Sequence, residues 1–400
     1  MRAPSCVIIV ENLPVPFDRR VWQEACALRD AGWTVSVICP LTDKYPETFE
    51  MIDNIAVYRH PLPEARGKAA FALEYGTALF HEFRLLMRVA RERGFDVIQV
   101  CNPPDLLFLP ALPFKFFGSK FIFDHHDISP ELFAVKFGQK GLLHRALKKF
   151  ERWTFQTADL VISTNETFRE IAIERGGKDP DHVVTVYSVP DVSRIRRVAP
   201  DKSLSAGKNI VLGYVGIIND QDGVDHVVRA VHHLVHDFGI RDVHTVIVGD
   251  GPALPSVRAL ADELGIADEI TFTGYLSGEN LLAALSVFDI GIIPDPPNEY
   301  NDKISMNKVF EYSALGIPIV AYNLTETKRL LRGALAPSQN DEPSGLAAAL
   351  HELIVDEKKR QALGRASAAV ARGNFSWDNE AAKLVEAYER LLPRLQLAEV

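Results

Sequence analysis

Short runs of β-branched residues alternate with amphipathic helix patterns along almost the whole chain, and this alternation most limits what it can fold into. Between the strand patterns lie longer stretches of 3.6-residue periodicity, such as 19–31 and 71–93, each followed by a glycine. Such alternation predicts βαβ units and a parallel sheet covered by helices. In the first half the strand patterns fall at 6–10, 34–39, 56–60, 96–100, 120–126, 160–165 and 183–189.

The alternation is interrupted at residues 190–208, where Pro, Ser, Gly and Lys gather and periodicity is lost. A length of 400 residues also favours two domains. We therefore expect an α/β protein with two Rossmann-like, doubly wound domains, 1–195 and 205–375, which face a central cleft. An amphipathic helix within 376–400 is expected to pack back onto the first domain. In the second half the strand patterns fall at 209–218, 243–251, 269–276, 289–296 and 318–323.

Charge and cysteine content narrow the class of protein further. The net charge is −9, and residues 1–200 hold 26 Lys and Arg against 25 Asp and Glu, so no basic stripe favours nucleic acid as a partner. The four cysteines lie within the first 101 residues without a CxxC pair, so we expect no metal site and a reduced, cytoplasmic location. The start of the chain does not resemble a signal peptide, and no run of eighteen apolar residues predicts a membrane span.

Residues 298–320 gather polar groups just before a predicted buried strand. We expect Ser305 to cap a short helix, Met306 to lie on its apolar face and Gly316 to end it. The helix follows a strand, so its N-terminus should open at the carboxyl edge of the second sheet. Free N–H groups and the helix dipole attract a phosphate there.

Four polar side chains of this helix region are candidate ligand contacts. Lys303 and Lys308 would add positive charge, Asn307 would lie beside them, and Glu311 would accept hydrogen bonds from ribose hydroxyls. The alternative is that Lys308 and Glu311 form only an exposed i, i+3 pair. Both interpretations stay open on the sequence alone.

Glycines follow two other strands of the second half, at Gly216 and in the run 249–252. They could let backbone approach a ligand, or serve only as turns. Neither site has GxGxxG or GxxxxGK[ST], which argues against a dinucleotide-dependent oxidoreductase.

In the first half, His125, His126 and Asp127 directly follow a strand. A histidine there can donate to a departing phosphate or position an acceptor hydroxyl. A zinc site is disfavoured because the ligand spacing is wrong. At least one of the two histidines is expected to do no more than cap the turn at Ser129 and Pro130.

The segment NLPVPFDRRVW joins the first strand to the first helix and brings Phe17, Asp18, Arg19 and Arg20 to the same sheet edge. These arginines could hold an anionic substrate, or pair only with Asp18 and Glu24. Residues 136–155 form a basic amphipathic pattern. It could lie on an anionic membrane surface or be an ordinary surface helix.

Several of these segments together resemble the retaining glycosyltransferases of family 4, which have the GT-B architecture. Within that family the chain is similar to the bacterial branch that builds O-antigen, capsule or exopolysaccharide, including WbuB-like proteins. The resemblance covers nearly the whole chain. It is carried by PFDRRVWQEACALRDAGWTVSVICP (16–40), CNPPDLLFLPAL (101–112), FDHHDISPEL (123–132), GYVGIINDQDGVDHVVRAV (213–231), VIVGDGPALPSVRAL (246–260), TFTGYL (271–276) and PDPPNEYNDKISMNKVFEYSALGIPIVAY (294–322).

The resemblance implies transfer of a sugar from a nucleotide diphosphate sugar, by default a UDP-sugar, with retained anomeric configuration and without a metal or other cofactor. The acceptor would be a saccharide, free or linked to polyprenyl diphosphate. The donor would bind the second domain and the acceptor the first, with Phe17, Asp18, Arg19, Arg20 and Asp127 as acceptor contacts. Location would be cytoplasmic, at the inner face of the plasma membrane if residues 136–155 dock there.

The resemblance also carries roles to single residues. Glu311 matches the glutamate that holds the ribose, Tyr275 and Leu276 the loop near the base, and Gly216 the loop near the diphosphate. His126 matches a histidine near the transferred sugar. The remaining donor contacts would be Ser305, Met306 and Asn307.

Two departures from the family pattern stand out. Lys303 occupies the position of the family's first glutamate, and Asp222 stands where lysine is common. We therefore expect Lys303 and Lys308 to neutralise the leaving diphosphate. A nucleotide-sugar epimerase or a non-catalytic sugar-nucleotide-binding subunit remains the alternative.

Overall fold

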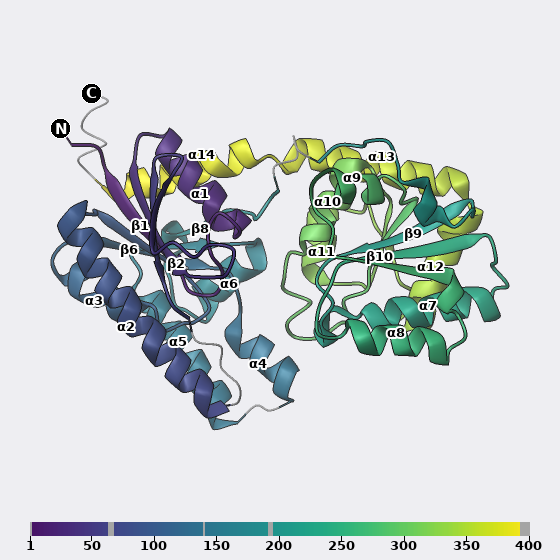
Figure 1. Cartoon of the computed structure of the whole chain (residues 1–400), viewed down its shortest axis with the longest axis horizontal. Coiled ribbons are helices and arrows are strands. Elements are labelled where there is room, and N and C mark those ends of the chain that lie inside the picture. The colour runs from purple at the N-terminus through teal and green to yellow at the C-terminus, as the bar shows by residue number, and fades with distance from the viewer. Residues whose placement is uncertain (1, 63–67, 139–140, 191–194, 393–400) are drawn as a thin grey trace. The chain divides into compact units, whose positions relative to one another are not determined.

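The structure is a computed structural model that describes residues 2–62, 68–138, 141–190 and 195–392 (Figure 1). It divides into two compact units. The first comprises Met1–Ser188 and Asp378–Val400, and the second comprises Val189–Trp377. The first boundary therefore falls just before the predicted linker at 190–208.

The first unit is built on an eight-stranded sheet in the order β3-β4-β2-β1-β5-β6-β7-β8. All neighbouring strands are parallel except β3 and β4. Strands β2 and β5 flank β1 on opposite sides, which places a topological switch point at the carboxyl end of β1. The strands are β1 (Ser5–Val10), β2 (Thr34–Pro40), β3 (Phe49–Ile52), β4 (Ile55–His60), β5 (Val97–Cys101), β6 (Lys120–His125), β7 (Leu160–Ser163) and β8 (Val183–Thr185).

Helices cover the first sheet and bury its strands on both faces, so β1 and β4 are buried along their whole length. The last helix, α14, returns to this unit. Its Tyr388 is fully buried, packs edge-on against Trp33 and donates a 2.5 Å hydrogen bond to Gln99. The helices are α1 (Arg19–Asp30), α2 (Lys68–Glu92), α3 (Phe108–Phe116), α4 (Ser129–Phe137), α5 (Leu142–Thr157), α6 (Glu166–Glu174) and α14 (Trp377–Arg390).

The second unit has a six-stranded parallel sheet in the order β11-β10-β9-β12-β13-β14. Strands β10 and β12 flank β9, which makes the carboxyl end of β9 the switch point of this sheet. The strands are β9 (Ile210–Val215), β10 (Val243–Val248), β11 (Ile270–Gly274), β12 (Ile290–Ile293), β13 (Ile319–Ala321) and β14 (Ala336–Pro337).

The helices of the second unit follow the strands as the periodicity predicts. They are α7 (Val224–His236), α8 (Leu254–Glu263), α9 (Gly278–Leu285), α10 (Asn307–Leu315), α11 (Thr325–Leu331), α12 (Pro343–Val355) and α13 (Glu357–Asn374). The α/β class with two Rossmann-like units is confirmed.

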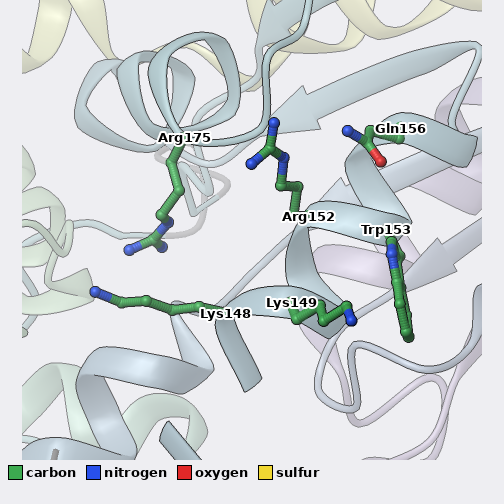
Figure 2. A pocket seen from close by; sticks show the side chains of 6 residues that line it. All are labelled: Lys148, Lys149, Arg152, Trp153, Gln156 and Arg175. Carbon is green, nitrogen blue, oxygen red and sulfur yellow. The ribbon is translucent and has the colours of Figure 1, made fainter. Parts of the chain in front are cut away.

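The predicted basic segment 136–155 corresponds to the end of α4 and most of α5, and residues 139–140 lie outside the described residues. Basic side chains of α5 line a pocket on the first unit (Figure 2). In the part of the chain that the structure describes, no helix combines the length and apolar character needed to cross a membrane.

Candidate active site

In the second unit, the loops after β9 and β10 pack together too closely for side chains. The N–H of Ile218 donates to the carbonyl of Asp250 at 3.0 Å. A Cβ on Gly249 would lie 1.8 Å from the carbonyl oxygen of Gly216, and one on Gly251 would lie 2.3 Å from that of Ile218. Only glycine fits at these two positions, so the backbone of both loops lines the carboxyl edge of the sheet.

Helix α10 begins at the same edge, but not as predicted. It starts at Asn307 with Met306 as its N-cap, and no side chain caps its first turn. The predicted cap Ser305 lies one position too early, and its buried hydroxyl has no hydrogen-bond partner within the described residues. The N-terminal N–H groups of α10 therefore lack a side-chain acceptor, which leaves them able to bind an anion.

The position of α10 is fixed by Tyr312, a buried residue that the sequence analysis did not single out. Its hydroxyl accepts a 3.0 Å hydrogen bond from the N–H of Val215 and donates a 3.2 Å bond to the carbonyl of Gly213. A Cβ on Gly291 would lie 2.6 Å from the Tyr312 ring. The helix is therefore held rigidly against β9 and β12.

Lys308 lies on the buried side of α10 and is not an exposed partner of Glu311. Its Nζ is 2.7 Å from Oδ2 of Asp295 and 4.8 Å from the centre of the Tyr214 ring. Burial raises the pKa of the Asp295 carboxyl, while Lys308 opposes this shift. The prediction that Lys308 gives its charge to a diphosphate does not match this arrangement, because the charge is already paired.

Several polar residues of 298–303 build a turn. Oδ1 of Asn298 accepts the N–H of Asn301 at 2.8 Å, and Oδ1 of Asp302 accepts the N–H of Thr325 at 2.8 Å, which anchors the start of α11. Lys303 ends this turn and is half-buried. It stays a candidate contact for the diphosphate.

Asp222, which stands where the family has lysine, also has a local structural role. Its Oδ2 accepts hydrogen bonds from the backbone N–H and the side-chain amide of Asn219, at 2.9 and 3.0 Å. The carboxylate thus stabilises the turn before α7, and its position supplies no cation.

The other predicted donor residues differ in how far their side chains are exposed to solvent. Tyr275 directly follows β11 and is 69% exposed. Leu276 is half-buried, Asn307 is exposed, and Glu311 is buried in the second turn of α10. Tyr275 thus offers a mostly exposed ring at this edge.

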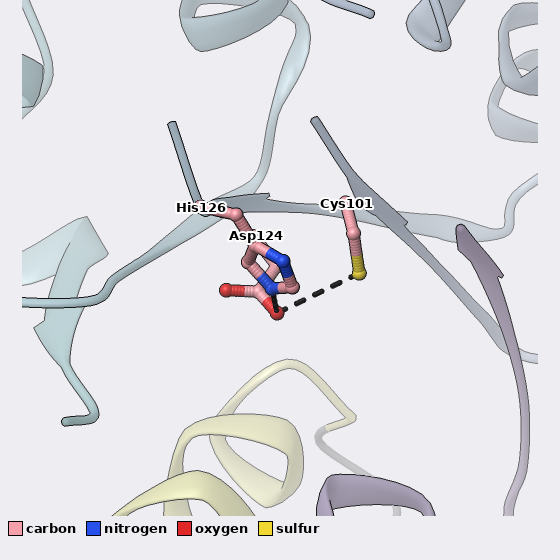
Figure 3. A group of neighbouring side chains, drawn as sticks. All are labelled: Cys101, Asp124 and His126. Carbon is pink, nitrogen blue, oxygen red and sulfur yellow. Dashed lines mark hydrogen bonds and ion pairs between the residues drawn. The ribbon is translucent and has the colours of Figure 1, made fainter. Parts of the chain in front are cut away.

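In the first unit, the ring of His126 lies against a buried carboxylate. Its Nε2 lies 2.6 Å from Oδ2 of Asp124 (Figure 3). Oδ1 of the same carboxylate accepts a 2.9 Å hydrogen bond from Arg20. Although burial opposes ionisation, Arg20 and His126 hold the pKa of the Asp124 carboxyl well below its usual range. The same Nε2 also accepts a 3.0 Å hydrogen bond from Nε of Arg20, so Nε2 points inward and Nδ1 is the ring nitrogen left for a ligand.

Asn102, directly after β5, holds the backbone of this loop. Its Oδ1 accepts hydrogen bonds from the N–H groups of His126 and Asp127, at 2.7 and 3.1 Å. Its amide donates to Oδ1 of Asp105 at 2.8 Å. Burial raises the pKa of the Asp105 carboxyl to about 7. The sequence signal was a polar residue at the end of a buried strand, the same signal that marked His126.

His125 has a different environment from its neighbour. Its ring is fully buried, 4.8 Å from that of Phe168 and 5.0 Å from that of Phe155. Burial lowers its pKa to about 3, so it is a neutral core residue. The predicted cap at Pro130 is wrong for both histidines, since His144 occupies that place with Nδ1 3.0 Å from the Pro130 carbonyl.

Arg20 is not an exposed acceptor contact. It is buried, and its guanidinium reaches Asp124, Glu24 at 3.0 Å and the Val186 carbonyl at 2.9 Å. The alternative that this arginine pairs internally therefore holds. Asp18 caps α1 by accepting the N–H of Val21.

The remaining acceptor candidates are more accessible. Phe17 and Arg19 are exposed, and Asp127 is half-buried. These three residues stay candidates for acceptor binding.

Cys101, Asp124 and His126 offer donor atoms that all lie within 4.8 Å of one another (Figure 3). However, both carboxylate oxygens of Asp124 are already hydrogen-bonded, and burial together with Asp124 raises the pKa of the Cys101 thiol. A metal ion would also lie beside the Arg20 guanidinium. The donor set therefore fits an internal hydrogen-bond network better than a metal ion.

Comparison with known proteins agrees with this geometry. The family model for the glycosyl transferase 4-like domain matches residues 18–188, and the model for glycosyl transferases group 1 matches residues 209–356. The 2-deoxystreptamine glucosyltransferase of Streptomyces kanamyceticus is 25% identical over 84% of this chain and 89% of its own length.

Solved structures share the architecture. Sucrose-phosphate synthase from Thermosynechococcus elongatus matches with a TM-score of 0.79 and 18% identity over 98% of this chain and all of its own. The Anabaena protein Alr3699/HepE in complex with UDP-glucose matches with a TM-score of 0.70 and 15% identity over 96% of this chain and 99% of its own. Fold, site and both family models thus define a GT-B transferase. The chain belongs to the family 4 glycosyltransferases, and this confirms a transferase over the alternatives of an epimerase and a non-catalytic subunit.

Proposed function

We propose that the enzyme transfers a sugar, with retention of configuration, from a UDP-sugar to a saccharide or a polyprenyl-diphosphate-linked saccharide in bacterial polysaccharide synthesis. The observation that carries the donor assignment is the uncapped N-terminus of α10, which begins beside Ser305 at the edge of the second sheet. Free N–H groups there stabilise the charge that grows on a leaving diphosphate.

The base and the ribose of the nucleoside would contact two different residues near this phosphate position. Tyr275 offers an exposed ring for the base, and Glu311, one turn inside α10, offers a carboxylate for the ribose. The UDP-glucose complex of the Anabaena neighbour supports UDP as the nucleotide. Half-buried Lys303 would supply the cation that Lys308 cannot.

Retention without a protein nucleophile lets the leaving phosphate itself accept the proton of the acceptor hydroxyl. His126 would then hold a sugar hydroxyl through Nδ1, since its Nε2 is occupied by Asp124 and Arg20. We propose that no metal or other cofactor takes part. The helix N-terminus and Lys303 would take over the stabilisation that a metal ion gives elsewhere.

The proposed location is cytoplasmic, at the inner face of the plasma membrane. The acceptor would bind the first unit near Phe17, Arg19 and Asp127. The basic outer face of α5 supports contact with an anionic surface.

The donor is tested by a thermal-shift panel of UDP, GDP and ADP and their sugars. UDP at 100 times its dissociation constant should stabilise the enzyme by about 2.7 kcal/mol, and the Tyr275→Ala variant should respond less. Stereochemistry is read from the anomeric proton of the product by NMR during transfer to a saccharide acceptor. The absence of any nucleotide response would overturn the donor site, and a product of inverted configuration would overturn retention.

A further inference from the structure

The first unit contains a pocket that the transfer reaction does not use. Its volume is about 510 Å³, within the range typical of small-molecule sites. Figure 2 shows the side chains of Lys148 and Arg175 ending on the same side of the pocket. The lining residues are Lys148, Lys149, Arg152, Trp153, Gln156 and Arg175.

The positive charge of this pocket is only partly compensated. Arg175 is held from behind, at 2.5 Å by Glu131 and at 2.6 Å by the fully buried Glu151. In contrast, Lys148 and Arg152 form no ion pair with any carboxylate in the described parts of the chain. Cations gathered in one concave site repel each other unless an anion joins them, so the pocket favours an anionic ligand.

The outer face of α5 extends this pocket without adding any negative charge. Its exposed residues include the four cations Arg145, Lys148, Lys149 and Arg152. Glu151, the one acidic residue of the helix, points into the core. The Lys149 ammonium also lies 4.9 Å from the centre of the Trp153 ring.

Exposed apolar side chains lie on the same helix as these cations. Leu142 is 82% exposed, Leu143 55% and Trp153 41%. A small water-soluble anion in the pocket would leave these apolar side chains exposed to water. A lipid whose phosphate entered the pocket would place its acyl chains beside them, and Trp beside Lys or Arg is typical of residues at a membrane surface.

We propose that the pocket binds the phosphate group of an anionic membrane lipid, with Lys148 and Arg152 as its cationic contacts and Leu142 and Trp153 against the bilayer. This rests on the proposed peripheral location and names the group that is recognised there. The site would orient the first unit at the membrane where a lipid-linked acceptor is presented.

The test is sedimentation of the full chain with three kinds of vesicle: phosphatidylcholine alone, phosphatidylcholine with phosphatidylglycerol, and phosphatidylcholine with oleate at equal surface charge. We expect the wild type to bind the phosphatidylglycerol vesicles. The Lys148→Ala/Arg152→Ala variant should bind them more weakly, by a factor of about ten or more. The matched control is Lys358→Ala/Arg365→Ala, which removes two exposed cations from α13 of the second unit and should change nothing.

Three other results of these experiments would contradict the proposed lipid site. Equal binding by the wild type and Lys148→Ala/Arg152→Ala would overturn the site. Equally strong binding to oleate vesicles would reduce it to unspecific charge attraction. If Leu142→Ser/Leu143→Ser kept full vesicle binding while pyrophosphate displaced the protein from vesicles, the ligand would be a soluble phosphate and not a lipid. The thermal response to UDP, measured on the same variants, should stay unchanged, so failure here is distinct from failure of the donor assignment.

Discussion

The Nε2 atom of His126 lies 2.6 Å from Oδ2 of Asp124, a carboxylate with no exposed surface. Nε2 also accepts a 3.0 Å hydrogen bond from Nε of Arg20, so this nitrogen points inward and Nδ1 is the one that can meet a ligand. Arg20 keeps the carboxylate ionised from the other side, and Asn102 fixes the backbone of His126. Three buried residues thus orient the half-buried ring and backbone of His126.

Replacement of Asp124 by Asn should therefore impair the contribution of His126 to catalysis, because it removes the negative charge beside the ring. We expect kcat to fall by about 10²- to 10⁴-fold with a smaller change in KM, because the ring loses the charged carboxylate beside its Nε2. The measurement is steady-state transfer with a UDP-sugar. Cys101→Ala, which removes a neighbour of Asp124 that does not touch the ring, is the control and should keep most activity.

A double variant shows whether Asp124 acts through His126. The combination Asp124→Asn/His126→Ala should be no slower than His126→Ala alone, since groups that act as a unit are not additive. Additive losses would contradict the proposed relation between the two residues.

Loss of Lys308 should weaken the second unit through Asp295. Lys308→Met leaves a buried carboxylate without its ion pair, which costs about 3 kcal/mol in the free energy of unfolding. Lys308→Met/Asp295→Asn should recover part of this loss. Urea unfolding measures both, with the exposed Lys328→Met as control. If Lys308→Met were as stable as the control, the pair would not hold α10 in solution.

Lys303 should affect turnover and not stability. Its removal takes away a half-buried cation beside the start of α10, so Lys303→Ala should lower kcat by roughly tenfold to a hundredfold. Lys303→Arg keeps the charge and should retain more activity. Unchanged kinetics of Lys303→Ala would show that the helix N-terminus alone supports the leaving group.

Tyr275 should contribute to donor affinity alone. A ring stacked on a base is worth about 1–3 kcal/mol, so Tyr275→Ala should weaken UDP binding roughly tenfold to a hundredfold. Tyr275→Phe keeps the ring and should bind nearly as the wild type does. Calorimetric titration with UDP distinguishes these cases, and equal affinity of all three proteins would remove Tyr275 from the site.

The sequence predicts the strands well where hydrophobic runs are buried on both faces. Residues 6–10 correspond to β1 and residues 160–165 to β7. Two strands are missed. Strand β14 has only two residues, and β3 is a short antiparallel edge strand, half exposed along its length, so it lacks a continuous apolar run. Its only local signal was the Asp53-Asn54 turn, where both residues have positive φ.

Site residues at strand ends could likewise be predicted, but their partners could not. His126 and Lys308 stand out as polar residues beside buried strands. That Asp295 pairs with Lys308 depends on how the loop between β12 and α10 folds. That Asn102 holds His126 depends on β5 and β6 being neighbours in the sheet. The same information separates exposed Arg19 from buried Arg20, because the helix pattern alone does not show which side meets Asp124.

His125 should make the first unit sensitive to acid. Burial lowers its pKa to about 3, whereas the unfolded chain protonates it near 6.5. Between these values only the unfolded state takes up the proton. The stabilisation is thus complete above about pH 6.5 and falls by up to about 1.4 kcal/mol per pH unit as the pH drops.

His125→Phe should remove this dependence, because a phenyl ring fits between Phe155 and Phe168 and neither ring nitrogen of His125 has a hydrogen-bond partner among the described residues. We expect the variant to unfold in urea much like the wild type at pH 8 and to be about 2 kcal/mol more stable at pH 5. The exposed His182→Phe is the control and should follow the wild type at every pH. Parallel stability curves for wild type and His125→Phe would mean that His125 titrates normally in the folded protein, which is incompatible with a ring sealed in the aromatic core.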